Sequence, residues 1–431
     1  GDALSDRAVC PIYGRGLGRA WSRFTGHGLL GSYQGDQTAM FKPELKNNPI
    51  LRSQQVLKAL IAIVRPHLPL ALKNTRITAD DIIAVLGYAS ANRISIDAAC
   101  HELQGMPSAN RLREVLAEAL SDRSKVQRAL NTILRVQLPA CIKKGKREYH
   151  VAIDLTLIPY HGECYEDEKE ILRSLAKSGT THFHGYATVS IVHNNLRYVV
   201  ALRFVEKGES MQAIVVWLLN RLKTLGIRIK RAYFDKGFSG VPVLKTLARR
   251  KLSFVMPIPV RGKSGGVRKL FKASASYKTT YTINSPKHGT LEVNAVAVKK
   301  YSKGRYKRRG SVWFAYAVAG LPTSIEPQQI FELYRLRFGI ESSYRQMNQV
   351  RARTTSRKPI LRLLLVGLAF ILFNVYMASR QHLAICGKTA SLLFSKLWLT
   401  LRRLARMLAH AVENLYGLAD VILRHPNFAL S

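Results

Sequence analysis

Three acidic side chains stand at positions where they could do chemistry together. Asp154 interrupts the apolar stretch VAIDLTLI, where a charge in mid-strand is unfavourable unless another group balances it. Asp235 follows the apolar residues of AYFDKGFSG, at a point where a strand ends and side chains enter a crevice. Glu341 is the single acid in YRLRFGIESSYRQMN. Each acid alone could be a capped or salt-bridged structural residue, so a site requires that the three come together.

Three clustered carboxylates would offer hard oxygen ligands, which suit Mg²⁺ or Mn²⁺. Two such ions about 4 Å apart can activate a water or a 3′-hydroxyl and stabilise the leaving oxygen of a phosphodiester. The sequence therefore predicts a site for two Mg²⁺ or Mn²⁺ ions held by Asp154, Asp235 and Glu341.

The segment around Glu341 is predicted to be one helix that follows a start at Pro327. One stripe of this helix is polar and charged, and a second stripe is apolar and packs. The first stripe consists of Tyr334, Arg337, Glu341, Arg345 and Asn348, and the second of Leu336, Ile340 and Met347. The alternative is a surface helix in which Glu341 only pairs with Arg345 one turn later.

The charge of the chain indicates a polyanionic partner. Lys and Arg number 67 against 27 Asp and Glu in 431 residues, a formal net charge of +40 that is spread along the sequence. Nucleic acid is the first candidate and a membrane surface the second. No apolar stretch reaches the ~20 residues that a membrane span requires. The closest, at 363–379, contains Gly367 and Asn374 and is predicted to be a buried helix.

Other residues that could bind metals or nucleotides give weaker indications. The five cysteines are scattered and include no CxxC pair, which argues against a disulfide framework or a zinc knuckle. With no secretory signal, this indicates a reducing cytoplasm. The GKSGG stretch at 262–266 lacks the leading glycine of a P-loop, so no nucleoside triphosphate is expected. His182 and His184 alternate on a predicted strand, where they could approach the metal site or belong to a satisfied polar face.

The N-terminal third divides into a leader and a helical region. Residues 1–39 show no regular periodicity, so we expect disorder there, with Met40 as the natural start and a disordered or non-native leader up to residue 46. Residues 47–146 are predicted to be all helical and to be a DNA-binding candidate. Three short helices with small-residue turns fit a helix-turn-helix whose last helix would present Arg111 and Arg113 to DNA. An ordinary helical bundle with arginines in solvent is the alternative.

From residue 147 the pattern changes to strands. Three strands in succession are followed by helix, strand, helix and strand, the order of a ribonuclease H-like fold. The strands are expected at 149–158, 183–193, 196–205, 228–234 and 253–258, and the helices at 211–225 and 241–250. The first and fourth strands are neighbours in this order, which would bring Asp154 and Asp235 together.

The predicted fold class is α/β: a ribonuclease H-like mixed sheet with a β-strand insertion, an N-terminal all-helical domain and C-terminal helices. The core is expected in two parts, 147–260 and 323–380. The insertion is expected at 261–322 between them, with strands at 278–283, 290–298 and 312–319, and the C-terminal helices at 381–431.

A basic run connects the last two strands of the insertion, with seven Lys or Arg in eleven residues and no acid. Its basic residues are Lys299, Lys300, Lys303, Arg305, Lys307, Arg308 and Arg309. Such a run can be a solvated loop, but in a chain of net charge +40 we favour a hairpin tip that contacts the DNA backbone.

These motifs together resemble a known family. The order Asp154, Asp235, Glu341 and the spacing of Tyr334, Arg337 and Glu341 resemble the DDE transposases of insertion sequences, in particular the IS-four superfamily. The blocks DLTLIPYHG, GTTHFHGYATV and YFDKGFSG are similar to its ISH-three branch. The resemblance implies cut-and-paste transposition: nicking at the element end, attack of the freed 3′-hydroxyl on the opposite strand to give a hairpin, hairpin opening, and strand transfer.

The resemblance also implies roles for single residues. Tyr334 and Arg337 would contact the phosphate near the scissile bond. The family signature ends in Lys seven residues after the glutamate, but Asn348 stands there, and Arg345 could supply the cation instead. The family stacks a flipped base on an aromatic residue of the insertion, for which Trp313 is the candidate, with core packing as the alternative.

The expected partners are double-stranded DNA, as transposon ends and target, and a second copy of the chain, because two element ends must be held together. We expect a cytoplasmic, nucleoid-associated protein of a prokaryote. Two alternatives remain open: a ribonuclease H-like nuclease or resolvase that cuts without joining, and a catalytically inactive DNA-binding regulator. The Tyr334, Arg337 and Glu341 signature argues against the first, and the presence of all three carboxylates against the second.

Overall fold

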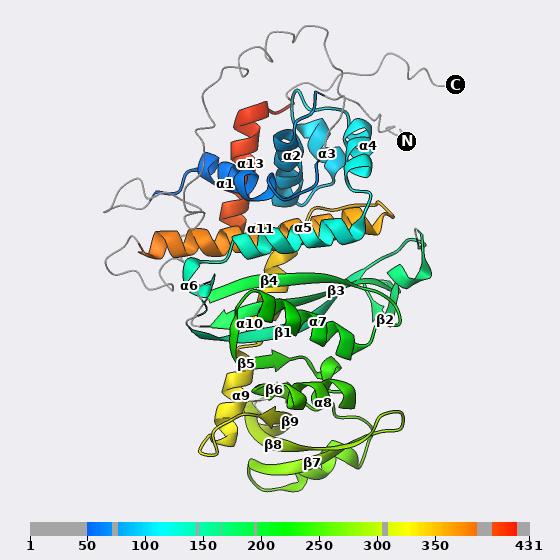
Figure 1. Cartoon of the computed structure of the whole chain (residues 1–431), viewed down its shortest axis with the longest axis vertical. Helices are drawn as coiled ribbons and strands as arrows, with labels where there is room; N and C mark the ends of the chain where they lie inside the picture. The colour runs from blue at the N-terminus through cyan, green and yellow to red at the C-terminus, as the bar shows by residue number, and fades with distance from the viewer. Residues whose placement is uncertain are drawn as a thin grey trace, which may run out of the picture.

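A nine-stranded mixed sheet forms the centre of the fold in the computed structural model (Figure 1). The structure describes residues 50–70, 76–143, 145, 147–164, 166–193, 196–303, 309–385 and 399–419. The leader predicted for residues 1–46 lies outside these ranges. The strands are β1 Glu148–Pro159, β2 Leu172–Lys177, β3 Thr180–His193, β4 Leu196–Val205, β5 Arg228–Phe234, β6 Phe254–Pro257, β7 Tyr277–Ser285, β8 Gly289–Lys303 and β9 Arg309–Ala319.

The strand order in the sheet is β2-β3-β1-β5-β6-β9-β8-β7, and β4 also pairs with β3. The strands β1, β5 and β6 are parallel, whereas β3 pairs antiparallel with β1 and β9 antiparallel with β6. The predicted α/β class and mixed sheet are therefore confirmed, and the pairing of β1 with β5 confirms that the first and fourth predicted strands are neighbours. The β insertion continues the same sheet through β9, β8 and β7.

The helices cover the sheet and form a layer beyond β4 (Figure 1). They are α1 Ser53–Val64, α2 Ala79–Asn92, α3 Ile96–Glu102, α4 Ala109–Ala119, α5 Arg123–Val136, α6 Ala140–Lys143, α7 Met211–Thr224, α8 Val241–Arg249, α9 Pro327–Arg335, α10 Phe338–Met347, α11 Pro359–Ile385 and α13 Leu401–Tyr416. The side chains of Thr78, Ser95 and Ser108 each accept a backbone N–H and begin α2, α3 and α4. One hydrophobic cluster extends from Val56 in α1 to Val412 in α13 and includes the sheet, so the N-terminal and C-terminal helices share its core.

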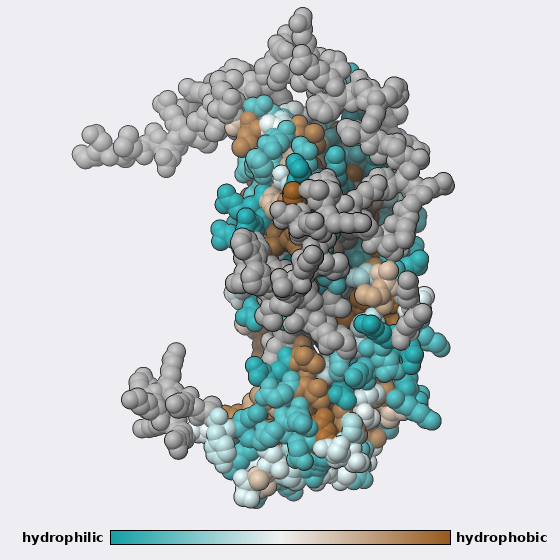
Figure 2. Space-filling view, turned by 90° about the vertical axis from the view of Figure 1, so that its left-hand side faces the viewer, coloured by the Kyte–Doolittle hydropathy of each residue, from teal (hydrophilic) through white to brown (hydrophobic). Residues whose placement is uncertain are grey.

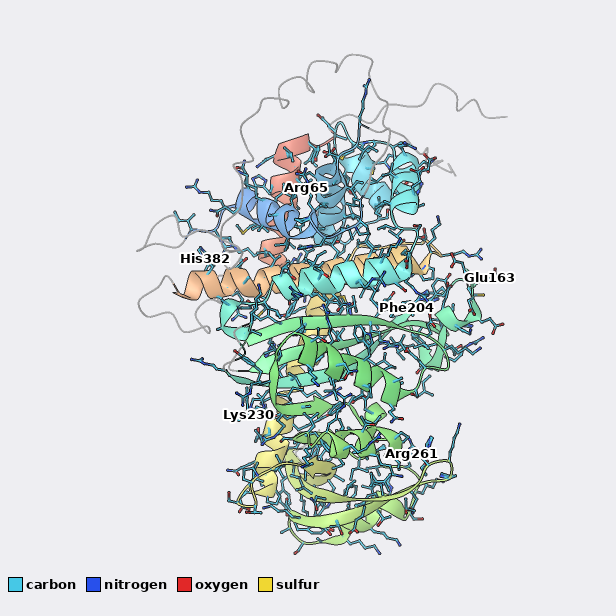
Figure 3. All side chains as sticks on the ribbon, viewed as in Figure 1. Arg65, Glu163, Phe204, Lys230, Arg261 and His382 are labelled. Atoms are coloured by element: carbon cyan, nitrogen blue, oxygen red, sulfur yellow. The ribbon has the colours of Figure 1, made fainter. Side chains whose placement is uncertain are left out.

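The open edge of β4 is closed by side chains from two helices. Asn131 of α5 accepts a hydrogen bond from the Leu202 N–H at 2.9 Å and donates one to its carbonyl at 2.7 Å. Asn374 of α11 does the same for Val199, at 3.0 and 2.9 Å. At the same boundary, Arg123 lies over the ring of Phe204, which Figure 3 labels beneath α5. The two asparagines replace a neighbouring strand, because buried backbone groups need partners.

The predicted single helix from Pro327 to Asn348 is wrong in one respect, because it is two helices. Between α9 and α10, the N–H of Leu336 bonds to the carbonyl of Leu333 and that of Arg337 to the carbonyl of Tyr334. These i to i−3 bonds tighten the chain into a turn. Leu336, which was expected on the packing stripe, is 39% exposed at this turn.

The sequence does not predict β2, a short edge strand with most of its side chains in solvent. It lacks the alternation of apolar and polar residues that identifies a half-buried strand. The helix α11 is long and apolar enough to cross a membrane by length and composition. However, 89% of its most apolar window is buried inside the fold, so it is a core helix, as its residues 363–379 were predicted to be.

The role of Asn374 gives a prediction about stability. In Asn374→Leu the N–H and carbonyl of Val199 stay buried without partners, and we expect the free energy of unfolding to fall by about 2–4 kcal/mol. Denaturant titration of the full chain measures this loss. The control is Asn414→Leu on α13, an exposed asparagine that bonds only to His410 among the described contacts. Equal small losses in both variants would contradict the role of Asn374.

Candidate active site

Asp154 and Asp235 lie side by side on the neighbouring parallel strands β1 and β5, near the carboxyl end of β5. In the register of β1 and β5, Ile153 lies opposite Phe234, so the aspartates occupy adjacent positions on neighbouring strands. Asp154 is still within β1 and its side chain is 9% exposed, whereas Asp235 follows β5 and is 36% exposed. The pair is therefore open to solvent mainly at Asp235. One carboxylate oxygen of each aspartate points to the same side chain, that of Arg337.

Arg337 lies between the two aspartates. Its Nη2 is 3.0 Å from Asp235 Oδ1 and 3.3 Å from Asp154 Oδ2, and its side chain is only 6% exposed. A guanidinium group shared by two carboxylates offsets the repulsion between them and the cost of burying Asp154. The arrangement shows that one cationic centre fits between these oxygens.

Tyr334 holds the end of β5 in place. Its hydroxyl donates to the carbonyl of Phe234, directly before Asp235, at 3.2 Å. The ring lies 5.7 Å from the Arg337 guanidinium and 5.1 Å from the ring of Tyr316 in β9. Burial raises the pKa of Tyr334 well above its usual range, so the hydroxyl keeps its proton and can donate. Tyr334 is 7% exposed and acts here as a support for the aspartate pair.

The helix α10 is anchored beside Asp154. Thr188 of β3 lies opposite Asp154 in the register, and its hydroxyl is 2.6 Å from the hydroxyl of Tyr344 in α10. Burial, and then the charge of Asp154, raise the pKa of Tyr344 well above its usual range. Glu341 lies in α10 one turn before Tyr344, but its side chain is outside the part of the chain that the structure describes. Through Tyr344, α10 is thus attached to β3 opposite Asp154.

The residues that bring the site together divide into those predicted and those missed. Asp154, Asp235, Tyr334 and Arg337 are in contact or one residue apart, as the sequence predicted for the aspartates. Sequence reasoning missed Thr188 and Tyr344. Their signals were present, since Thr188 belongs to the GTTHFHGYATV block and Tyr344 follows Glu341 by the three residues that share a helix face.

The carboxylate oxygens are the hard donors that a divalent ion prefers, and they already converge on a cationic group. The residues therefore fit a metal ion. Among the described residues, no group of three or more His, Cys, Asp or Glu side chains could hold a metal ion; the side chain of Glu341 is not one of those described. Arg345 and Asn348 are exposed at the end of α10.

The aromatic and basic residues of the insertion make contacts within the protein. Trp313 in β9 is half-buried and stacks on Phe271, with ring centroids 5.8 Å apart and planes 17° apart. Lys299 lies 5.5 Å from the Trp313 ring, and Lys300 is 3.3 Å from Glu332. At the two ends of the predicted basic run, β8 and β9 pair antiparallel as far as Lys303 and Arg309, whose side chains are not described. Arg305, Lys307 and Arg308 lie outside the described residues.

The arginines predicted to contact DNA from the helical region are exposed and form ion pairs on the surface. Arg111 is 3.0 Å from Glu114, and Arg113 is 3.4 Å from Asp97 and also bonds to Asn110. Such exposed pairs contribute little to stability, so these cations can exchange partners.

The sequence matches a known protein family. Residues 145–375, more than half of the chain, match the family described as a transposase DDE domain. The chain belongs to the DDE transposase family. A search of curated proteins found no match. Transposases of this family generally use divalent metal ions, which agrees with the carboxylate donors of the site.

His184 lies outside the site of this transposase. It is 1% exposed, and its ring lies 4.6 Å from that of Tyr160 and 6.0 Å from that of Phe204. It therefore belongs to an aromatic cluster, and neither of the two alternatives predicted for it is what the structure shows. Burial, followed by the charge of Arg362, lowers its pKa to about 4.

The lowered pKa predicts an acid-sensitive fold. The unfolded chain takes up this proton near pH 6.5 and the folded chain only near pH 4, so stability is full above pH 6.5 and falls as the pH drops. Between pH 7 and pH 5 we expect His184 to contribute a loss of about 2 kcal/mol. Denaturant titrations at both pH values of His184→Phe should lack this loss, and His182→Phe, on the same strand, should retain it. An unchanged pH dependence in His184→Phe would contradict the prediction.

Proposed function

We propose that this transposase moves an insertion sequence by a cut-and-paste route through a hairpin intermediate. The observation that carries the proposal is the convergence of Asp154 and Asp235 on one cation, inside the segment that matches the family. Carboxylates that already share a cation at a strand edge can bind divalent ions at the same place.

Asp154, Asp235 and Glu341 would hold Mg²⁺ or Mn²⁺ in this proposal. Bound there, two such ions would activate the attacking oxygen and stabilise the leaving oxygen of a phosphodiester. Within the chain, Tyr334 fixes the end of β5, and Thr188 and Tyr344 fix α10. These contacts keep the ligands at set distances, which phosphoryl transfer requires.

The DNA would approach the solvent-exposed side of Asp235. Arg345 and Asn348 are exposed on the helix that carries Glu341, and they are the proposed contacts to the backbone near the cleavage point. Arg337, with Tyr334 beside it, is the proposed phosphate ligand at the scissile bond. We propose further backbone contacts at Arg111 and Arg113 and at the β8–β9 hairpin, and base stacking at Trp313. In Figure 2, the lower part of the molecule, where the sheet lies in Figure 1, shows a face on which hydrophilic residues surround a narrow apolar strip.

Two copies of the chain would hold the two element ends together, as cut-and-paste joining requires. The proposed setting is the cytoplasm of a prokaryote. No step in the proposal uses a nucleoside triphosphate, because the energy of strand transfer is conserved in the exchanged phosphodiester bond.

Cleavage of a labelled duplex that carries the flanking ends of this gene tests the proposal. With Mg²⁺ or Mn²⁺ we expect nicks, hairpins and joined products, and in Asp235→Asn their loss by at least about 1,000-fold, because a ligand is removed from the transition state. The control is Asp167→Asn, an exposed carboxylate that pairs with Lys169 on the surface. Nicks without hairpins or joined products would indicate a nuclease. Tight binding without cleavage would indicate an inactive regulator.

Binding of the same duplex should depend steeply on salt. If about six to ten phosphates are neutralised, affinity should fall by on the order of 1,000-fold or more between 50 and 200 mM salt. Fluorescence anisotropy over this range measures the slope. A flat response would contradict a DNA contact dominated by the backbone.

A further inference from the structure

Arg337 contacts the carboxylate oxygens that would bind the metal ion in the proposed site. Its Nη2 contacts Asp154 Oδ2 and Asp235 Oδ1, one from each aspartate. Mg²⁺ binds oxygen ligands at about 2.0–2.1 Å. A guanidinium nitrogen 3.0 and 3.3 Å from the same oxygens leaves no room for such an ion between them. Arg337 and the ion are therefore alternatives.

We propose that Arg337 competes with the divalent ion for the two aspartates, and that this competition couples metal binding to DNA binding. The inference rests on the proposed function and concerns the regulation of the same site. Without metal, Arg337 neutralises the aspartate pair. When a metal ion binds to Asp154 and Asp235, the guanidinium group is released and binds a phosphate of the DNA.

The surroundings of Arg337 allow this exchange by a side-chain movement. Its backbone N–H is held by the Tyr334 carbonyl at 2.9 Å, directly before α10, so the main chain can stay in place. Asp154 is almost fully buried, whereas Asp235 is 36% exposed. The open side of the pair is thus at Asp235. A guanidinium that leaves Asp154 moves toward solvent and toward an incoming phosphate, with which it can form paired hydrogen bonds.

The exchange makes metal and DNA bind cooperatively. A phosphate that takes Arg337 away from the aspartates removes the competitor of the metal, and the metal in turn frees Arg337 for the phosphate. Because coupling between two ligands is reciprocal, each should raise the affinity of the other by the same factor. The competitor also keeps metal affinity low in the absence of DNA, so the hydrolytic site is assembled only on its substrate.

Mn²⁺ binding to the full chain without DNA tests the competition, with free Mn²⁺ followed by electron paramagnetic resonance. We expect Arg337→Gln to bind Mn²⁺ about tenfold more tightly than the wild type, because a charged contact to the ligands is removed. The matched control is Arg335→Gln, which removes the same charge two residues away from an exposed side chain paired with Glu332. It should change the affinity less than about twofold. Equal or weaker binding in Arg337→Gln would overturn the competition.

Addition of a 20-base-pair duplex tests the coupling. In the wild type and in Arg335→Gln the duplex should tighten Mn²⁺ binding by about tenfold, and in Arg337→Gln it should not. A duplex that tightens Mn²⁺ binding equally in all three proteins would overturn the coupling through Arg337.

Two further variants separate this inference from the proposed function. Asp154→Asn combined with Asp235→Asn should abolish Mn²⁺ binding; if it does not, the metal site itself is wrong and the competitor with it. If Mn²⁺ binding is lost in that double variant but unchanged in Arg337→Gln, only the competitor is wrong. Arg337→Lys retains a charge for the buried Asp154 if Arg337→Gln fails to fold. Its single ammonium is a weaker match for two carboxylates, so it should also bind Mn²⁺ more tightly than the wild type, and binding no tighter would overturn the inference.

Discussion

The parallel pairing of β1 and β5 places two negative charges side by side on neighbouring interior strands of the sheet, and much of the surrounding structure compensates for them. Two carboxylates in a medium of low polarity repel strongly unless a cation lies between them. The turn between α9 and α10 brings Arg337 to that point, and Tyr334 supports both the strand end and the guanidinium. The break in the predicted helix therefore lies at the residue that contacts both aspartates.

Much of this fold could be predicted, because its core strands carry their own signals. The strands 196–205 and 228–234 have the predicted bounds, and Asp154 and Asp235 were placed by the strand order alone. The turn at Leu336 and Arg337 could not be predicted, since helical periodicity continues through it and only tertiary contacts interrupt the helix. The partners of Tyr344 and Arg337 lie more than 100 positions away in the chain, and local pattern does not specify them.

The large positive charge has a second use besides attraction of a polyanion. Several cations are built into the fold through their ring contacts: Arg123 lies over Phe204, Arg362 over Tyr160 and Lys300 over Phe331. Such contacts stabilise a cation on an aromatic face. Part of the net charge of +40 therefore also has a structural role.

The closure of β4 by Asn131 and Asn374 bears on how this chain can change during evolution. An uncovered strand edge invites pairing with other chains, so the helices that cover β4 protect the catalytic sheet from aggregation. A recombination event that exchanged the N-terminal helices for another module would also remove Asn131 and expose that edge. The helical layer and the sheet therefore depend on each other, whereas the β7–β9 extension lies at the opposite end of the sheet, away from this contact.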